Sequence, residues 1–521
     1  MLSGAGIVVR LKENELLFYI IFSVLLLSLA CGFIYSLRVQ FLLLSVLMVS
    51  VSVQFSKRYI KDKAATAVLL PLAAVFFSCM GADFQVNARN VSVGLINAVA
   101  AFFLMSYAAR RSREKIFFTL PFLGLWVSFL LFIQFFTGGC EIERSFALNI
   151  NILSGFLVLV YPAALALGEK NKYPLAFILI ALMIFAAAAL TRSRMGMFLV
   201  YLTTLFYFIR LKSRREFRIL FAASSFLVVA GIVYAFFFKS GWDSLGERFV
   251  WWQTAWVMFK DNPFFGIGFG NYSALFSFYR TQPVLNTLFA HNMFIQILAE
   301  TGISGAICFG AAFYAMAKSI FRSFKNKNGD PVYMIGALAG IVCFLIFNIT
   351  EYSFYIPLCM MVFFVLCGFA CGFETGEREK KAPYRLIALP AAFVIYTVFW
   401  PALAENYYEK GKSYAAAKDF ENARLWYLKA VKFDKKNPEY YHQAADSSFR
   451  LYILSAGTER SFLDDTINFE LMSEKFYTHS AQIKAGLANL YNLKGDFDNA
   501  GKYAAAAGEA DKFNPNYGSL R

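Results

Sequence analysis

The feature that most constrains this chain is a series of apolar runs, each about twenty residues long. A bilayer core of ~30 Å is crossed by ~20 residues at a rise of 1.5 Å each, so such runs predict membrane-spanning helices. Hydrophobic residues make up 59% of the 521 residues and charged residues only 16%, a balance far from that of a soluble domain. About thirteen spans are expected on this basis, over residues 15–37, 39–56, 64–82, 91–109, 116–137, 147–167, 173–191, 195–209, 217–238, 290–320, 332–350, 354–373 and 385–402.

The net charge of +16 is carried by the membrane part, because the 16 basic and 16 acidic residues after residue 400 cancel. Lysine and arginine fall mainly in alternate loops, with 25 on one side and nine on the other. This asymmetry is the positive-inside pattern, which predicts orientation and argues against a nucleic-acid partner. It places the N-terminus in the cytoplasm and, with an odd number of spans, the C-terminal part outside.

Targeting and metal signals are weak. The first apolar run is too long for a cleavable signal peptide and lacks a small-residue cleavage site, so it is expected to be retained as an anchor. None of the eight cysteines forms a CxxC motif, and only Cys140 is expected in an outer loop. We therefore expect neither a disulfide framework nor a metal site.

The longest expected outer loop covers about residues 239–290. Its stretch DSLGERFVWWQTAWVMFKDNP predicts an interfacial helix, which Asn262-Pro263 would end. Its four tryptophans suit a membrane–water boundary; they are Trp242, Trp251, Trp252 and Trp256. The following GIGFGNYSALFSFYR predicts a glycine-containing turn and a second short helix, since no βαβ unit surrounds Gly266, Gly268 and Gly270 that would make a nucleotide loop.

The C-terminal part has a different character. Residues 411–441 and 487–517 are similar to each other, with Ala423 and Ala500 in matching DFENA and DFDNA motifs. Their spacing of small and aromatic residues resembles tetratricopeptide repeats, and residues 440–483 have room for a divergent middle repeat. The chain is therefore predicted to be all-α, with a transmembrane domain at 1–402 and a helical repeat domain at 403–521 that could bind a protein partner.

Polar residues gather where the expected spans meet the outer face. One of only three histidines, His291, heads the apolar run that follows the outer loop. Arginines also lie at this face, where the positive-inside rule disfavours them; they are Arg192, Arg194, Arg248 and Arg280. Arginine at a membrane face is often a snorkelling anchor. A phosphate or pyrophosphate at headgroup depth would also explain it, because guanidinium binds such groups bidentately.

The stretches TRSRMG, ERFVWWQTAWVMFKDNPFFGIGFGNY and AHNMFIQILAETGISGAI together resemble the O-antigen ligase and polymerase superfamily over about residues 190–310. Members have about a dozen membrane helices and a large outer loop, and use a glycan donor linked to undecaprenyl pyrophosphate. The resemblance implies a bacterial cytoplasmic-membrane glycosyltransferase without cofactor. The thirteenth span and the repeats exceed the plain ligase pattern, although some relatives carry such tails.

The resemblance also assigns roles to residues. His291 would be the catalytic base for the acceptor hydroxyl, and Arg194 and Arg248 would bind the pyrophosphate as it leaves, giving inversion by direct attack. Arg192 and Arg280 are further candidates for substrate binding or simple anchoring. Asn292 could orient His291 or cap its helix, and both alternatives stay open.

Three glutamates need an interpretation. Glu247 could pair with Arg248 or act as a base, and pairing is the simpler expectation. Glu300 lies nine residues beyond His291, about 13 Å along a helix, so it is expected to be structural. Glu351 is noted only as an ionisable residue among the spans.

Three functions compete. The first is transfer of a polyprenyl-linked glycan, with ligase activity onto lipid A core favoured over polymerisation of repeat units or transfer to a protein hydroxyl. The second is transport of the lipid-linked glycan, which would favour ionisable residues near the midplane. The third is a membrane anchor that presents the repeats, which leaves the outer arginines unexplained.

Overall fold

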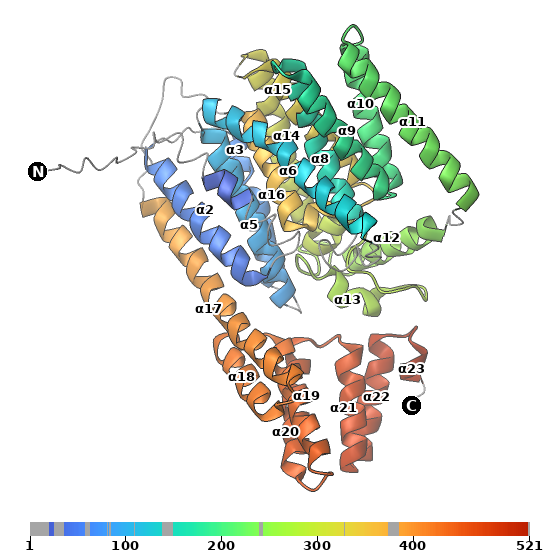
Figure 1. The fold of residues 1–521 in the computed structure, drawn as a ribbon. Helices are drawn as coiled ribbons and strands as arrows, with labels where there is room; N and C mark the ends of the chain where they lie inside the picture. The colour runs from blue at the N-terminus through green and yellow to red at the C-terminus, as the bar shows by residue number, and fades with distance from the viewer. Residues whose placement is uncertain are drawn as a thin grey trace, which may run out of the picture.

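The computed structural model describes residues 20–25, 36–57, 63–80, 82, 85–108, 110–137, 150–238, 243–327, 329–372 and 385–518. Every regular element within these ranges is a helix, which agrees with the all-α prediction. Figure 1 shows a large helical bundle and a smaller group of helices below one end of it. We call that end of the bundle the site end.

The bundle contains helices of very different lengths, and two of them, α12 and α13, lie at the site end. They are α2 (Leu37–Lys57), α3 (Lys63–Ala67), α4 (Leu70–Met80), α5 (Gln85–Tyr107), α6 (Arg110–Phe136), α8 (Ile150–Lys170), α9 (Pro174–Leu190), α10 (Arg194–Arg210), α11 (Arg215–Phe238), α12 (Asp243–Asp261), α13 (Tyr272–Tyr279), α14 (Met293–Lys325), α15 (Pro331–Phe347), the 3-10 turn η1 (Ser353–Tyr355) and α16 (Pro357–Cys371).

Four helices of the described part are long and apolar enough to cross a membrane: Gln85–Tyr107, Ser112–Phe136, Ile150–Lys170 and Met293–Lys325. Five apolar helices are shorter: Leu37–Met48, Ala64–Met80, Pro174–Leu190, Pro331–Phe347 and Pro357–Cys371. These helices indicate that the chain is an integral membrane protein. The count of about thirteen spans stays a prediction. Most of the expected first span, together with Cys140 and Trp242, lies outside the described residues.

The centre of the bundle is formed by α8 and α16, whose side chains are buried nearly all round. A helix that is apolar on every face is stable only when other helices cover it. On α15, Gly336 and Gly340 face α8 closely. A Cβ added to Gly336 would lie 2.6 Å from Cβ of Ala166, and a Cβ added to Gly340 would lie 2.5 Å from the Leu159 carbonyl oxygen. This small-xxx-small spacing holds α15 against α8 as it does in membrane helix pairs.

One expected span is broken at its start. Residues 64–82 form α3 and α4, separated by a turn at Val68 and Leu69. Pro71 follows this turn at the second position of α4, where its missing N–H costs no helical hydrogen bond. Apolar periodicity alone did not indicate this break.

The expected span at 290–320 is also interrupted, because Gly302 inside α14 has φ 64° and ψ −165°. This backbone region is open essentially to glycine alone. The turn after α12 crosses α14 at this point. Ile303 N donates to Pro263 O at 2.9 Å, and Gly268 N donates to Glu300 O at 3.0 Å. The turn therefore satisfies the peptide groups that the break leaves without helical partners.

The crossing requires glycine on both chains. A Cβ on Gly302 would lie 2.4 Å from the carbonyl carbon of Phe264, and one on Gly266 would lie 2.2 Å from that of Glu300. We call this contact the glycine crossing. It consists of Gly266 against the backbone of Glu300 and Gly302 against the backbone of Phe264. It fixes the outer loop to the helix that begins just after His291.

The outer loop forms the two helices that the sequence predicts. Figure 1 shows α12 lying across the site end, at a steep angle to the bundle helices, with α13 below it. Asn262 ends α12 as expected, because Pro263 cannot continue the helix. On α12, Ala255 and Met258 are buried, whereas Phe249 and Trp256 are exposed.

The C-terminal helices pack as antiparallel pairs. They are α17 (Arg385–Ala416), α18 (Phe420–Phe433), α19 (Pro438–Leu454), α20 (Arg460–Phe476), α21 (Ala481–Lys494), α22 (Phe497–Ala510) and α23 (Pro515–Gly518). In α17, Gly411 faces Tyr427 of α18 so closely that a Cβ would lie 2.6 Å from the ring. This contact explains the small and aromatic spacing, and the tetratricopeptide assignment stays a prediction.

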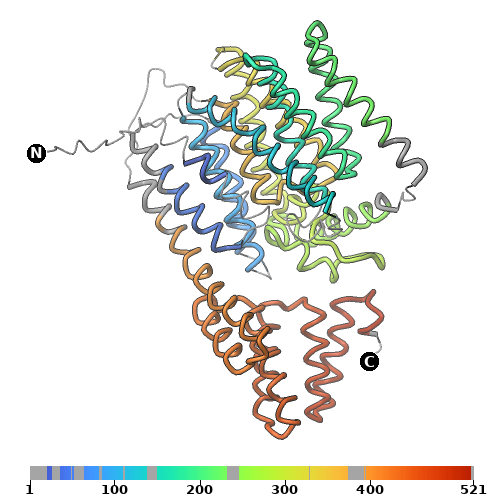
Figure 2. Tube along the Cα trace, in the orientation of Figure 1, coloured from blue at the N-terminus to red at the C-terminus, as the bar shows by residue number. Residues whose placement is uncertain are grey.

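The helix α17 runs without interruption through the expected domain boundary at residues 402 and 403. The trace in Figure 2 shows it leaving the bundle and continuing into the C-terminal helices. We call residues 403–518 the tail. A continuous helix gives the tail a fixed direction relative to the bundle, because no loop intervenes.

The tail is docked on the site end through ion pairs. Arg89 Nη2 lies 2.7 Å from Asp434 Oδ2, and Arg280 pairs with Asp511. Tyr477 OH donates to Ala274 O of α13 at 2.7 Å. The tail is therefore in contact with the outer loop.

Candidate functional site

Four segments far apart in the sequence meet at the site end. They are the first turn of α8, the start of α12, the residues before α14, and the link between α15 and α16. Their polar side chains are directly bonded to one another, so the site is defined by contacts rather than by proximity in sequence.

His291 lies directly before α14 in a left-handed backbone conformation, with φ 51°. The helix itself is capped by Asn292, whose Oδ1 accepts from Phe294 N at 3.0 Å and Ile295 N at 3.1 Å. Met293 N donates to Asn348 O at 2.9 Å and so ties the helix start to the end of α15. Of the two roles open for Asn292, the structure shows the helix cap.

Glu351 is the centre of the polar cluster. Its Oε2 lies 3.2 Å from His291 Nδ1, and its Oε1 accepts from Arg248 Nη2 at 2.7 Å and from Asn151 Nδ2 at 3.0 Å. The Glu351 residue is only 3% exposed and His291 only 9%. We call His291, Glu351, Arg248 and Asn151 the histidine cluster. Burial strengthens such charge-assisted contacts because little water screens them.

The carboxylate determines which imidazole nitrogen carries the proton. An ionised carboxylate only accepts hydrogen bonds, so Nδ1 of a neutral His291 must be its protonated nitrogen. The other nitrogen, Nε2, then has the lone pair of a general base. A buried acid that orients a histidine in this way also stabilises the imidazolium that forms after proton transfer.

Aromatic rings hold the imidazole in place. Trp251 stacks on it with ring centroids 4.6 Å apart, and Tyr352 meets it edge-on at the same centroid separation. Trp252 Nε1 also reaches the His291 carbonyl oxygen at 3.4 Å. Two of the tryptophans expected to anchor the loop in the membrane interface thus contact the histidine instead.

The predicted pair Arg192 and Arg194 lies at the turn between α9 and α10. Arg192 has a left-handed φ of 54°, and both side chains belong to exposed residues. Ser193 caps α10 by accepting from Gly196 N at 3.4 Å. The turn therefore places two arginines next to the positive end of the α10 helix dipole.

This turn adjoins the histidine cluster through α8. A Cβ on Gly196 would lie 1.8 Å from Ser154 Oγ, so the first turn of α10 rests on Ser154. Ser154 is three residues after Asn151, which places both on one face of α8. Asn151 bonds Glu351, so α8 links the arginine turn to the cluster.

Two predicted cations have internal partners. Arg248 pairs with Glu351 and not with Glu247, which corrects the simpler expectation for Glu247. Arg280 donates to Asp511 and, at 2.7 Å, to Val284 O. Arg280 therefore lies in the contact between loop and tail and is not brought to the histidine cluster.

Glu300 is fully buried and structural, as its helical distance from His291 suggested. Its Oε1 accepts from Tyr272 N at 3.1 Å and from Gln296 Nε2 at 3.1 Å. The carboxylate thereby caps the start of α13, and Gln296 in turn accepts from Ala290 N at 3.0 Å. This chain of bonds connects the glycine crossing to the residue before His291.

Sequence reasoning missed three members of the site: Glu351, Asn151 and Trp251. Glu351 had a usable signal, since it is an acidic residue between two apolar runs whose outer ends face the same side as His291. Asn151 and Trp251 had none, because one resembles a helix-start residue and the other an interface anchor. Within the described ranges no group of three or more histidine, cysteine, aspartate or glutamate side chains could hold a metal.

Comparison with known proteins gives one informative match. Residues 178–310 match the O-antigen ligase family. This range contains His291, Arg194 and Arg248, and it supports a glycan-transfer function in a membrane. No curated protein matches the sequence.

Among solved structures, the crystal structure of yeast Tom70 is similar at 14% sequence identity and a TM-score of 0.19, over 67% of this chain and 76% of that one. A similarity at this score carries no argument about the fold or the function.

Proposed function

We propose, from the match of residues 178–310 to the O-antigen ligase family, that this chain transfers a glycan from an undecaprenyl-pyrophosphate donor to an acceptor hydroxyl. The reaction would take place at the outer face of the bacterial cytoplasmic membrane, with the N-terminus in the cytoplasm and the tail outside. The observation that carries the proposal is the histidine cluster, a buried acid–base pair at the end of the bundle that α12 covers.

The chemistry follows from the two nitrogens of His291. Nε2 takes the proton of the acceptor hydroxyl as the oxygen attacks the anomeric carbon of the donor sugar. The bond from that carbon to the pyrophosphate oxygen breaks, and undecaprenyl pyrophosphate leaves with the bonding electrons. Attack from the face opposite the leaving group inverts the anomeric carbon. Glu351 stabilises the imidazolium, as a buried acid does in the serine hydrolase triad.

The arginines have two different proposed roles. Arg194, with Arg192 beside it, is exposed at the head of α10 and is suited to hold the pyrophosphate. Arg248 already pairs with Glu351, so its first role would be to hold that carboxylate in position. One hydrogen-bond donor aimed at charge that develops in the transition state is worth about 3–4 kcal/mol in other enzymes.

The acceptor class is the open part of the proposal. Lipid A core, a further glycan repeat unit and a protein hydroxyl would all present the same nucleophile to His291. The contact of the tail with α13 supports a bulky acceptor, because paired helices form extended binding surfaces near the site. Ligase activity onto lipid A core remains the first choice, with the polymerase and the protein oligosaccharyltransferase as alternatives.

The test is transfer in proteoliposomes that contain an undecaprenyl-pyrophosphate glycan, with lipid A core, free repeat unit or a pilin-like protein as acceptor. The variants are His291→Asn and Arg194→Ala. Asparagine is chosen because it tolerates the left-handed backbone at this position. The control is Arg215→Ala, an exposed arginine at the start of α11.

We expect His291→Asn to lower the rate ~10²–10⁴-fold and Arg194→Ala ~10²–10³-fold, with Arg215→Ala near wild type. The acceptor that is used assigns the subclass. Full transfer by His291→Asn would exclude the general-base role. If the wild type transfers glycan to none of the three acceptors, the glycosyltransferase proposal fails, and movement of the lipid-linked glycan across the bilayer becomes the function to measure.

A further inference from the structure

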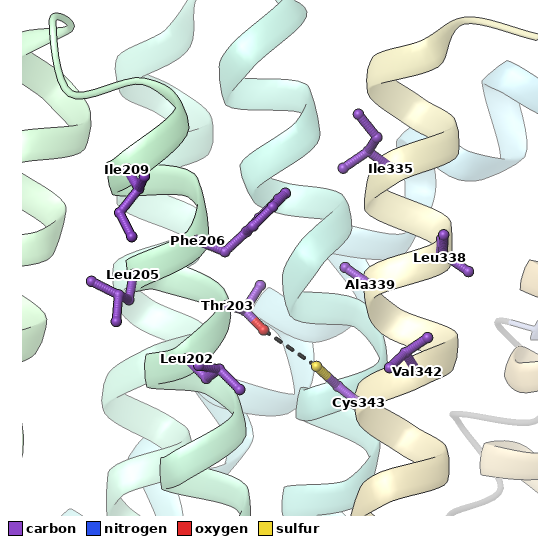
Figure 3. Close-up of a pocket in the computed structure, with 10 residues that line it drawn as sticks. All are labelled: Leu202, Thr203, Leu205, Phe206, Ile209, Ile335, Leu338, Ala339, Val342 and Cys343. Atoms are coloured by element: carbon purple, nitrogen blue, oxygen red, sulfur yellow. Dashed lines mark hydrogen bonds between the residues drawn. The ribbon is translucent and has the colours of Figure 1, made fainter. Parts of the chain in front are cut away.

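An apolar groove lies between α10 and α15 on the outside of the bundle, with a volume of about 570 Å³. Figure 3 shows α10 on one side and α15 on the other, with the Phe206 ring projecting into the space between them. The lining residues are Leu202, Thr203, Leu205, Phe206, Ile209, Ile335, Leu338, Ala339, Val342 and Cys343. All but Thr203 and Cys343 are hydrocarbon side chains, so the groove suits a hydrocarbon ligand.

The groove exists because α10 and α15 each pack on α8 and leave a space between them. Gly336 and Gly340 draw α15 close to α8, while Gly196 does the same for the first turn of α10. At the floor, Thr203 Oγ1 lies 3.4 Å from Cys343 Sγ and also donates to Leu199 O at 2.8 Å. The one hydroxyl in the lining is therefore already bonded, and the floor offers no polar group to a ligand.

The exposed side chains of the walls remain accessible from the bilayer. Leu202 is 42% exposed, Phe206 47% and Val342 43%. A groove with such walls in a membrane protein is filled by some lipid chain. The position of the groove relative to the arginine turn indicates which one.

The groove lies on the helix that the arginines head. Leu202 is eight residues beyond Arg194 and Ile209 is fifteen residues beyond it, so the groove extends from ~12 to ~22 Å from the backbone of Arg194, measured along the helix axis. Half of a ~30 Å hydrocarbon core is ~15 Å. A chain whose headgroup is held at Arg194 must therefore pass the bilayer midplane to fill the groove. An ordinary acyl chain from that leaflet ends near the midplane, whereas a polyisoprenoid chain continues beyond it.

We propose that the groove between α10 and α15 binds the polyisoprenoid chain of the donor lipid, with its pyrophosphate at Arg192 and Arg194. This inference rests on the proposed function for the identity of the donor. It assigns the groove the role of a length selector, since only a long chain reaches from the arginine turn to Ile209. Short-chain donors would bind through the headgroup alone.

The first test is a comparison of two donors that carry the same glycan, one on an eleven-isoprene chain and one on a three-isoprene chain. Ala339→Trp fills the groove from the α15 wall. The control is Ala222→Trp, at an exposed alanine of α11 outside the groove. We expect Ala339→Trp to raise the KM for the long donor about tenfold, the loss expected when roughly two methylene groups lose their burial, with the kcat unchanged. The KM for the short donor should not change in either variant.

An equal effect of Ala339→Trp on both donors, or an effect on neither, would overturn the assignment. A second measurement does not depend on activity. A polyprenyl pyrophosphate with a photoreactive diazirine near its far end should crosslink to peptides of α10 and α15, and Ala339→Trp should abolish that crosslink. If diazirine-labelled phosphatidylglycerol gives the same crosslink and excess polyprenyl pyrophosphate does not displace it, the groove belongs to bulk lipid. A wild type that crosslinks in the groove but transfers no glycan would refute the proposed reaction and leave the groove assignment intact.

Discussion

At the scale of single residues, the decisive feature is that Glu351 serves His291 and Arg248 at once. One oxygen faces the imidazole and the other accepts from the guanidinium. The arginine thus holds the carboxylate in position, and an ionised carboxylate keeps the proton of a neutral imidazole on Nδ1. Glu351 and Arg248 act on His291 as one unit, so the effects of substituting Glu351 and Arg248 on the transfer rate should not be additive.

We predict that Glu351→Gln lowers the kcat of transfer ~10²–10⁴-fold with little change in folding, because an amide can turn its donor toward Nδ1 and select the wrong tautomer. Glu351→Asp should retain more activity, since it keeps an acceptor-only group. The rate is measured in the proteoliposome assay. Glu169→Gln is the control, because Glu169 also pairs with an arginine, Arg210 at the other end of α10, far from His291. A Glu351→Gln enzyme that is as fast as Glu169→Gln would contradict the orienting role.

The residues of the site were predictable to an unequal degree. His291 and Arg194 were singled out because a rare histidine and outward arginines at a membrane face need a reason, and the family resemblance then assigned their roles. Glu351 was seen but not connected, since the link between α15 and α16 approaches His291 only through packing around α8. Arg280 was a candidate for substrate binding or anchoring, yet in the structure it pairs with a carboxylate of the tail, 231 positions away in the sequence. An ion pair between residues this far apart in the sequence cannot be predicted from the spacing of neighbouring residues.

At the scale of elements, the glycine crossing connects the loop to α14 through backbone contacts alone. Helix positions were predictable, because apolar runs and the Asn262-Pro263 stop are local signals. The break in α14 was not, since a single glycine in a helical pattern is normally only a weak site. Only the approach of Phe264 explains why Gly302 has no side chain.

We expect Gly302→Ala to destabilise the protein severely, by about 3 kcal/mol or more, because it combines an unfavourable left-handed backbone with a backbone clash. The melting temperature of the detergent-purified protein measures this effect. Gly310→Ala is the matched control on the same helix, since an added Cβ there meets nothing within 4 Å. That control should stabilise the helix by up to about 1 kcal/mol. Similar melting temperatures for both variants would show that the crossing is not tight.

At the scale of the whole molecule, cations of the site end find their partners in the tail. Arg38, Arg89 and Arg280 pair with Glu405, Asp434 and Asp511 respectively. These pairs supply a second reason for positive charge on the side that the loop charges predict to be outside. They also explain how a tail that is nearly neutral overall docks on these arginines, because three of its acidic residues lie at the contact.

We predict that Arg280→Ala releases the end of the tail, because it leaves Asp511 buried and unpaired, a loss of about 3–5 kcal/mol in comparable pairs. Both side chains are largely buried, at 8% and 5% exposure. Tryptic cleavage within α21 and α22 should become faster while the bundle stays folded. Arg450→Ala is the control, since its exposed pair with Asp446 is worth only about 0.3–0.5 kcal/mol. Equal cleavage rates in the two variants would show that the Arg280 pair does not hold the tail.

The tail should also respond to pH. The hydrogen bond from His442 to Glu470 raises the pKa of the imidazole above its ordinary value, and Glu439 and Asp446 add to the rise. A raised pKa in the folded state stabilises the protein fully below the unfolded pKa of about 6.5, and this contribution is lost as the pH rises through the higher folded pKa. The melting temperature of wild type should therefore exceed that of Glu470→Gln by more at pH 5.5 than at pH 9. A difference that is constant with pH would show that the pair does not titrate.

The uninterrupted α17 has a consequence for how such a protein can change over evolution. Each residue added to a helix turns everything beyond it by ~100° and advances it by 1.5 Å. A single insertion near residue 402 would therefore swing Glu405, Asp434 and Asp511 away from their arginines together. Seven inserted residues would nearly restore the rotation but lift the tail by ~10 Å. Bundle and tail are thus inherited in a common helical phase, and a chimera that exchanges tails can work only when its junction preserves that phase.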